Sequence, residues 1–580
     1  MANRFLELKR RAKAPVPAGG ISCRIAVLGD FATQHLSVAI RGVAAERGVG
    51  VELLDVDYDQ IEQQTVDPSS ELFEFHPDFV VVARCVEKLH AEYASMEIEA
   101  RAGLAECRYA EVEETWKRIL SSSAATVLEL NYAVVDDRIF GDYANSVIGS
   151  FLSQGRRLNT LLMEGAAQNP GVLIIDVEQI QARMGRETFS EPKLYLSSRI
   201  PFSLDGICEV ASSVVSSVQA RLGAIKKCIV CDLDNTLWGG VVSEDGVAGI
   251  QIGELGAGPA FTELQIWLKL LRERGVLLAV CSKNDDSIAR EPFERNPEMV
   301  LSLDDFAMFV ANWEDKASNI RVIQQTLNIG MDSIVFIDDN PFERNLVREM
   351  LPEVTVPELP DDPSLYLPFL QELNLFATAA YSREDANRTS QYIAEGRRRE
   401  SESSFADYGE YLDSLDMVAG CLPFDDFHAP RIAQLTQRSN QFNLRTVRYG
   451  EDEVRALSTD PDAITRYFTL RDRFGDSGLV SVVILRHRGE KSLFIDSWLM
   501  SCRVLKRGLE DFVMNEIVSA AREAGAERVI GEYRPTLKNA MVKPLYEKMG
   551  FSRVGKDVDS ELWELEVDKY SERATYIERG

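Results

Sequence analysis

Short apolar runs that end in polar or acidic residues are the feature that most constrains the fold of this chain. Ile25-Ala-Val-Leu28, Cys228-Ile-Val-Cys231, Val276-Leu-Leu-Ala-Val280 and Ser333-Ile-Val-Phe-Ile337 are of this kind, and helical patterns lie between them. An apolar run without alternating polar residues is typical of a strand that is buried on both faces. Strands of this kind that alternate with helices predict parallel α/β sheets.

The pattern changes along the 580 residues, and three α/β domains are predicted. We expect a parallel α/β domain at 1–222, a second parallel sheet with a minimal cap at 223–372, a helical connector at 373–415 and a mixed α/β domain at 416–580. The last domain has strand-like runs at 464–469, 480–485 and 492–496 before one long helix from Leu509 to Ala524.

Composition excludes several classes of protein. The net charge of −28 argues against a nucleic-acid-binding protein, which needs a basic face. The sequence has no long apolar run that predicts a membrane helix, and its first residues do not resemble a secretory signal. The nine cysteines are scattered, which favours the reducing cytoplasm. Cys228 and Cys231 have the spacing of a metal or redox pair, but their place in one strand favours buried core thiols.

Two aspartates, Asp232 and Asp234, follow the Cys228–Cys231 run, and Thr236 comes directly after them. Two carboxylates at the carboxyl end of a strand can share one Mg²⁺, and one of them can attack phosphorus. Ser282, Lys316 and the pair Asp338-Asp339 follow in that order. Hydroxyl and ammonium groups suit phosphate oxygens. The sequence therefore predicts a phosphoryl-transfer site.

These four elements resemble the motifs of the haloacid-dehalogenase-type phosphatases. The resemblance implies that Asp232 is the nucleophile and that Asp234 is the acid and base. It implies Mg²⁺ on Asp232, the Asp234 carbonyl and Asp338 or Asp339. The residues implied to bind the phosphorylated substrate are Thr236, Ser282, Lys283, Asn284 and Lys316. Only some 50 residues separate Asp232 from Ser282, so we expect an open site that admits a group carried on another protein.

A closer resemblance covers residues 223–568. Leu237-Trp-Gly-Gly-Val-Val-Ser-Glu-Asp-Gly246, Ala311-Asn-Trp-Glu-Asp-Lys316 and Trp498-Leu-Met-Ser-Cys-Arg503 resemble the FkbH-like branch of that superfamily. The resemblance implies removal of phosphate from a three-carbon donor such as 1,3-bisphosphoglycerate. It also implies loading of the glyceryl unit on the phosphopantetheine thiol of an acyl carrier protein, in polyketide-type biosynthesis.

The last domain resembles the GNAT acyltransferase fold, in which a turn before a helix binds pyrophosphate. Arg503 and Gly508 match that turn, and Lys506 stands where the pattern has glycine. Cys502 is the candidate acyl acceptor, because Arg503, Lys506 and a helix N-terminus would lower the pKa of its thiol; a buried structural cysteine is the alternative. His428 is a candidate base. Cys231 and Cys281 are rival acceptors that strand burial disfavours.

The first domain resembles SGNH-type hydrolases, with Gly29-Asp30-Phe31 in place of their Gly-Asp-Ser. Phe31 cannot attack an ester, so we expect a non-catalytic domain for docking or dimerisation; Asn131 matches a further element of that pattern. The run Arg397-Arg398-Arg399 is interpreted as a solvated helix face rather than an anion site.

Two other functions stay open. One is a phosphatase of a small metabolite joined to an acetyl-CoA-dependent acetyltransferase, and the other is a scaffold with a relict site. The sequence does not decide whether the chain forms a homo-oligomer.

Overall fold

The computed structural model describes residues 2–13, 21–379, 398, 405, 407–439, 441–489, 491–501, 504–536, 539–556 and 560–580. The chain divides into two compact units. One runs to Ile225 and takes in a short segment from Phe376, and the other begins at Lys226 and carries two further sheets. In the described residues, no helix has the length and apolar character needed to cross a membrane.

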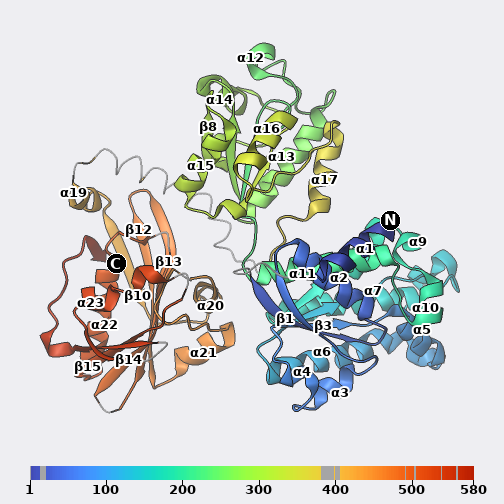
Figure 1. Cartoon of the computed structure of the whole chain (residues 1–580), viewed down its shortest axis with the longest axis horizontal. Helices are drawn as coiled ribbons and strands as arrows, with labels where there is room; N and C mark the ends of the chain where they lie inside the picture. Colours follow the sequence, from blue (N-terminus) through green and yellow to red (C-terminus); the bar gives the residue numbers. More distant parts are fainter. Residues whose placement is uncertain are drawn as a thin grey trace. The chain divides into compact units, whose positions relative to one another are not determined.

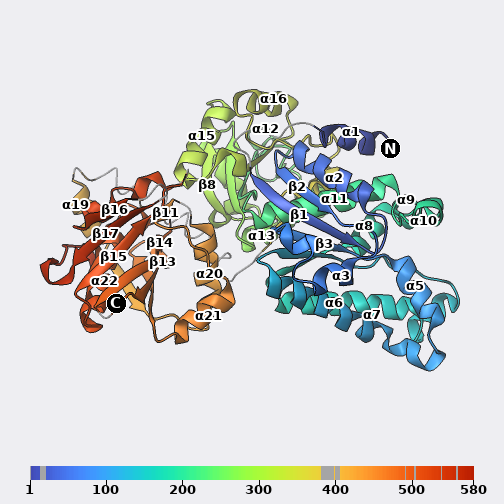
Figure 2. The same ribbon diagram turned by 60° about the horizontal axis from the view of Figure 1, so that its bottom comes forward.

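The first unit is a parallel sheet between two layers of helices. Its strands follow the order β2-β1-β3-β4-β5, with bounds β1 Ser22–Gly29, β2 Gly50–Asp55, β3 Phe79–Ala83, β4 Thr126–Leu130 and β5 Val172–Ile175. Figure 2 shows α2 (Gln34–Glu46) and α11 (Leu204–Arg221) on one face of the sheet, and α6 (Leu104–Ser122) and α7 (Phe151–Gln168) on the other. The remaining helices are α1 Ala2–Arg11, α3 Ile61–Val66, α4 Glu71–Glu74, α5 Val86–Ser95, α8 Val177–Met184, α9 Arg186–Phe189 and α10 Pro192–Ser198. The predicted parallel sheet is confirmed.

The middle sheet is parallel too, in the order β8-β7-β6-β9. Its strands are β6 Cys228–Cys231, β7 Leu277–Ser282, β8 Phe306–Ala311 and β9 Ile334–Ile337. Helices α13 (Gly258–Glu273) and α15 (Lys316–Leu327) cover opposite faces (Figure 1), with α14 at Asp286–Arg295 and α16 at Pro341–Met350. Strand β8 was not among the predicted strands. Between β6 and β7 the described chain holds only the short α12 (Val242–Asp245) and α13, which confirms the expected lack of a large cap.

The last sheet is mixed, as predicted, in the order β16-β17-β15-β14-β13-β12-β10-β18. Its strands are β10 Met417–Leu422, β12 Ala463–Asp472, β13 Gly475–His487, β14 Ser492–Met500, β15 Arg528–Tyr533, β16 Ser552–Lys556, β17 Glu561–Glu566 and β18 Ile577–Arg579. Helix α22 (Leu509–Glu523) packs into one hydrophobic core, and α20 (Ala429–Arg438) and α21 (Glu451–Thr459) pack into another. The short α23 spans Leu545–Lys548.

Strands β14 and β15 are parallel neighbours that pair only at their beginnings, over Ser492–Phe494 and Arg528–Ile530. Farther along, the short β11 (Phe442–Asn443) pairs with Met500 and Leu499 of β14. The Arg534 N–H, just past β15, donates to Leu444 O at 2.9 Å. The 442–444 segment therefore hydrogen-bonds to the backbone of β14 and to the residue just past β15, where the two strands separate.

The connector region is described in part. Helix α17 spans Tyr366–Leu373 and α19 spans Tyr408–Asp413, and most of the residues between them lie outside the described part of the chain. Of the arginine run only Arg398 is described, and for this residue the interpretation as part of a solvated face was wrong. Its side chain is 4% exposed and binds Asp472 through Nε and Nη2, at 2.7 and 2.9 Å. Sequence composition did not reveal this partner because it lies 74 residues away.

A close approach at Gly531 generates a stability prediction. A Cβ at this position would lie 2.3 Å from the Tyr546 ring, and Tyr546 is fully buried. We expect Gly531→Ala to destabilise the last sheet by about 1–3 kcal/mol, because the ring cannot move without displacing packed neighbours. Faster hydrogen exchange of the β15 and β17 amides would report the loss.

Gly555→Ala in β16 is the matched control. Its added Cβ would meet Leu562 atoms at 3.6 and 3.7 Å, which is ordinary contact. Equal exchange rates in both variants would contradict the packing explanation.

Candidate functional site

The carboxyl ends of β6, β7 and β9 lie side by side and carry the predicted motif residues. Cys231 at the end of β6 pairs with Val280 of β7 and Ile337 of β9. The Asp232 N–H then donates to Ile337 O at 3.0 Å. Because adjacent parallel strands end at one edge, Asp232, Ser282 and Asp338 are brought together from positions up to about a hundred residues apart in sequence.

Lys316 lies buried between two of these carboxylates. Its Nζ is 2.9 Å from Asp232 Oδ2 and 2.5 Å from Asp338 Oδ2, and its side chain is 2% exposed. It is the first residue of α15, whose N-cap Asp315 accepts a hydrogen bond from the Ser318 N–H. The capped helix start thus fixes the stem of Lys316 under the pocket.

Negative charge exceeds positive charge at this edge. Burial would lower the pKa of Lys316, but Asp232 and Asp338 outweigh it and hold the pKa above its ordinary value. Burial and the charge of Asp232 raise the pKa of Asp338 and of Asp339, against the opposing effect of Lys316. One ammonium does not neutralise three carboxylates, so the site favours an additional cation.

The turn after β6 holds the next two motif residues. Asn235 has a left-handed φ of 54°, a conformation that asparagine tolerates better than most residues. Thr236, which is fully buried, accepts a hydrogen bond from the Asp339 N–H at its Oγ1 at 3.0 Å. This contact joins the first and fourth motifs, and the substrate-binding role of Thr236 stays a prediction.

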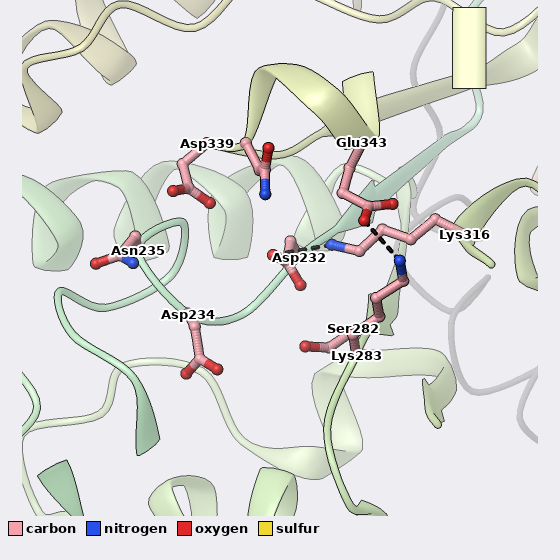
Figure 3. Close-up of a pocket in the computed structure, with 9 residues that line it drawn as sticks. Asp232, Asp234, Asn235, Ser282, Lys283, Lys316, Asp339 and Glu343 are labelled. Atoms are coloured by element: carbon pink, nitrogen blue, oxygen red, sulfur yellow. Dashed lines mark hydrogen bonds and ion pairs between the residues drawn. The ribbon is translucent and has the colours of Figure 1, made fainter. Parts of the chain in front are cut away.

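A pocket opens at this edge of the sheet (Figure 3). It is lined by Asp232, Asp234, Asn235, Ser282, Lys283, Lys316, Asp339, Asn340 and Glu343. Six of these residues were predicted from the motifs. Glu343 was missed; its Oε1 is 2.6 Å from Lys283 Nζ, while its buried Oε2 has no hydrogen-bond partner. The sequence feature that could have indicated Glu343 is an acidic residue in the first turn of the helix that follows Asp338-Asp339.

Asn284, predicted to bind phosphate, has a different contact in the structure. Its side-chain amide donates to Asp234 Oδ2 at 2.8 Å, and the residue is 2% exposed. Burial raises the pKa of Asp234.

The donor set fits a hard divalent cation. Asp232, Asp338 and Asp339 each offer an oxygen, and these oxygens lie within 4.8 Å of one another. Asp232 Oδ1 is buried and has no hydrogen-bond partner among the described residues. An orphaned carboxylate oxygen beside two further carboxylates is what a Mg²⁺ ligand set requires. The Asp234 carboxylate, by contrast, is engaged by N–H donors.

The candidate acyltransfer residues are described in part. Cys502 and Arg503 lie outside the described residues. Gly508 caps α22 with a φ of 76°, and Lys506 has a φ of 68° where the resemblance calls for glycine. Glu510 and Asp511 occupy the first turn of α22. These carboxylates already face the positive end of the helix, which disfavours a pyrophosphate there.

The structure also shows the surroundings of the other candidate residues, the possible base His428 and the rival acceptors Cys231 and Cys281. His428 Nδ1 lies 2.8 Å from Asp425 Oδ2, and its ring packs on Tyr467. Cys231 and Cys281 are fully buried; burial raises the pKa of Cys281 to about 12 and also raises the pKa of Cys231. A thiol that stays protonated is a poor nucleophile. The burial expected for these two cysteines is confirmed.

In the first unit, the hydrolase-like positions serve packing. Phe31 is 2% exposed and meets Phe202 edge to face, with ring centroids 5.5 Å apart. Asn131 Oδ1 accepts a hydrogen bond from the Val177 N–H at 2.6 Å, at the start of α8. Neither residue lies in an arrangement for ester hydrolysis.

Comparisons with known proteins agree with this geometry. The family model described as FkbH, N-terminal domain, matches residues 24–219. The N-terminal part of the protein BF1531 from Bacteroides fragilis, containing a phosphatase domain and complexed with Mg, is 45% identical, with a TM-score of 0.62; the match covers 65% of this chain and 99% of that chain.

Two acetyltransferase structures match a smaller part. The ribosomal-protein-S18-alanine N-acetyltransferase from Escherichia coli is 14% identical (TM-score 0.21), covering 27% of this chain and 99% of that chain. The GNAT domain of S. lividans PAT is 14% identical (TM-score 0.21), covering 25% and 89%. Among curated protein sequences there is no match.

The carboxylate cluster generates a metal-binding prediction. We expect Mg²⁺ to bind the full chain with measurable heat, and Asp339→Asn to weaken that binding by at least about tenfold, because a charged ligand becomes neutral. Isothermal titration calorimetry measures both affinities. Asp286→Asn is the matched control, since Asp286 pairs with Arg290 on the surface of α14. Equal affinity in all three proteins would place the metal elsewhere.

Proposed function

Because the chain belongs to the FkbH-like family, we propose that it is a Mg²⁺-dependent phosphatase and acyltransferase. It takes a phosphorylated three-carbon donor of the 1,3-bisphosphoglycerate type and removes phosphate. It then loads the glyceryl unit on the phosphopantetheine thiol of an acyl carrier protein in polyketide-type biosynthesis. The observation that carries the phosphatase half is the buried Asp232–Lys316–Asp338 arrangement at the pocket.

The pocket residues divide the phosphatase reaction among them. Asp232 attacks phosphorus, the P–O bond to the donor breaks, and a phosphoaspartate forms. Lys316 and Ser282 bind phosphate oxygens as charge shifts to them. Asp234 gives a proton to the leaving oxygen and later takes one from water. Asp232, Asp338 and Asp339 would hold Mg²⁺, which would offset the negative charge of the phosphate.

The acyltransfer half rests on the family resemblance and on Cys502. The Cys502 thiolate attacks the carbonyl of the donor, phosphate leaves, and a thioester forms; the carrier thiol then displaces Cys502 from the acyl group. Arg503 and Gly508 match the phosphate-binding turn of the GNAT resemblance, and we propose that they bind the phosphate of the phosphopantetheine arm. The dyad of His428 and Asp425 is a candidate base for the carrier thiol.

The alternative with acetyl-CoA is less well supported. Lys506 replaces a glycine of the pyrophosphate turn, and Glu510 and Asp511 fill the first turn of α22. The two acidic residues oppose a diphosphate more than a single phosphate, because the repulsion grows with the charge of the anion.

Mass spectrometry of the carrier tests the proposal. We expect the full chain with Mg²⁺ and 1,3-bisphosphoglycerate to add one glyceryl mass to a carrier that bears its phosphopantetheine arm. The same carrier without the arm stays unmodified. Phosphate release without an adduct on any carrier, over a panel from polyketide pathways, would overturn the acyltransfer half.

Cys502→Ala separates the two halves. We expect this variant to keep phosphate release from a phosphomonoester and to lose carrier loading, because only the second reaction needs the thiol. Cys421→Ala is the control in the same domain: Cys421 is half-buried, and burial raises the pKa of its thiol to about 12. Carrier loading retained by Cys502→Ala would remove Cys502 from the mechanism.

A further inference from the structure

The carboxylate of Asp234 is held by three N–H donors. Trp238 Nε1 and the Val242 backbone N donate to Oδ1 at 2.9 and 3.0 Å, and Asn284 Nδ2 donates to Oδ2 at 2.8 Å. The donors come from the turn after β6, from the start of α12 and from the loop after β7. Three separate segments therefore converge on one side chain of the pocket wall, which Figure 3 draws beside Asn235.

The two side-chain donors are fixed by their own surroundings. Trp238 is fully buried, and its ring meets Phe293 of α14 edge to face, with centroids 5.6 Å apart. Asn284 is 2% exposed and lies next but one to the pocket residue Ser282. Neither group can turn away without opening a packed region, so the carboxylate of Asp234 has a set orientation.

The hydrogen-bond inventory then singles out one atom. A carboxylate has about four acceptor positions, two on each oxygen. The two donors on Oδ1 use both of its positions, and Asn284 uses one on Oδ2. All three groups are N–H donors and none can accept a proton from Asp234. Within the described residues, a single acceptor position on Oδ2 therefore stays open.

We propose that Trp238 and Asn284 are positioning residues that reserve this open position of Asp234 Oδ2 for the transferred proton. The inference rests on the proposed phosphatase function and adds how the acid and base is oriented within it. Trp238 closes Oδ1 to protonation, and Asn284 sets the direction in which the open position of Oδ2 points.

The proton is accounted for in both steps. In the first, the Asp232–phosphorus bond forms, the bond from phosphorus to the leaving oxygen breaks, and the proton moves from Asp234 Oδ2 to that oxygen. In the second, water attacks phosphorus, its proton moves to Asp234 Oδ2, and the bond to Asp232 breaks. The side chain of Asp234 ends the cycle as it began.

Dependence on the leaving group tests the proposal in the full chain with Mg²⁺. A poor leaving group, such as the alkoxide of glycerol phosphate, needs the proton, whereas dinitrophenolate leaves without it. We expect Trp238→Phe, which keeps a ring and deletes the N–H, to lower kcat/KM at least about tenfold for glycerol phosphate and less than about twofold for dinitrophenyl phosphate. Asn284→Ser is a second variant. We expect it, too, to lower kcat/KM more for glycerol phosphate than for dinitrophenyl phosphate.

Trp313→Phe is the matched control. Its ring is exposed, and its indole N–H donates to Asp285 Oδ1 at 2.9 Å rather than to Asp234. We expect it to leave the ratio of the two kcat/KM values unchanged. An equal loss for both substrates in Trp238→Phe and Asn284→Ser would overturn the positioning role and leave a structural one. A wild-type chain that hydrolyses neither substrate would instead refute the phosphatase function.

Discussion

The ion pairs of Lys316 with Asp232 and Asp338 are the interaction on which the rest of the site depends. They tie the carboxyl ends of β6 and β9 to the start of α15, with all three side chains nearly excluded from solvent. Removing one partner from a buried pair of this kind costs about 3–5 kcal/mol, because a charge is left without compensation. Asp232, the proposed nucleophile, is therefore oriented by the same ion pairs that connect β6, β9 and α15.

This contact also sets the electrostatics of the pocket. The second lysine of the pocket, Lys283, is paired with Glu343, so both ammonium groups have carboxylate partners. A phosphate that enters meets a chain with a net charge of −28 and a pocket rich in acids. A divalent cation held by Asp232, Asp338 and Asp339 would, together with Lys316, balance these three carboxylates, so that a phosphate would no longer meet an excess of negative charge there.

The sequence predicted the elements and motif residues that depend on local pattern. Strand ends at Cys231 and Ile337 follow from buried apolar runs, and the acids placed directly after them are carried to one edge by parallel topology. Contacts made by distant residues left no local signal. The bond from Asn284 to Asp234 crosses 50 residues, and the pairing of Lys283 with Glu343 crosses 60. Arg398 was misread for the same reason, since a run of arginines does not show a buried Asp472.

The two anion sites expected from the sequence differ in how well the structure supports them. At the middle sheet, an excess of carboxylates and an orphaned oxygen of Asp232 call for a cation and then a phosphate. At α22, Glu510 and Asp511 lie in the first turn, where acidic side chains oppose an incoming anion, although Asp511 also pairs with Arg573. Strands β14 and β15 separate beside the start of α22. In the space between them, Leu444 O accepts a hydrogen bond from the N–H of Arg534, just past β15. An extended phosphopantetheine arm that reached this space would have to exchange hydrogen bonds with the 442–444 segment. Its affinity would therefore depend on contacts outside the space between β14 and β15. A carrier protein can supply such contacts from its own surface, whereas a free cofactor cannot. The occupied strand gap thus supports the proposal of a protein-borne acyl acceptor rather than a small soluble one.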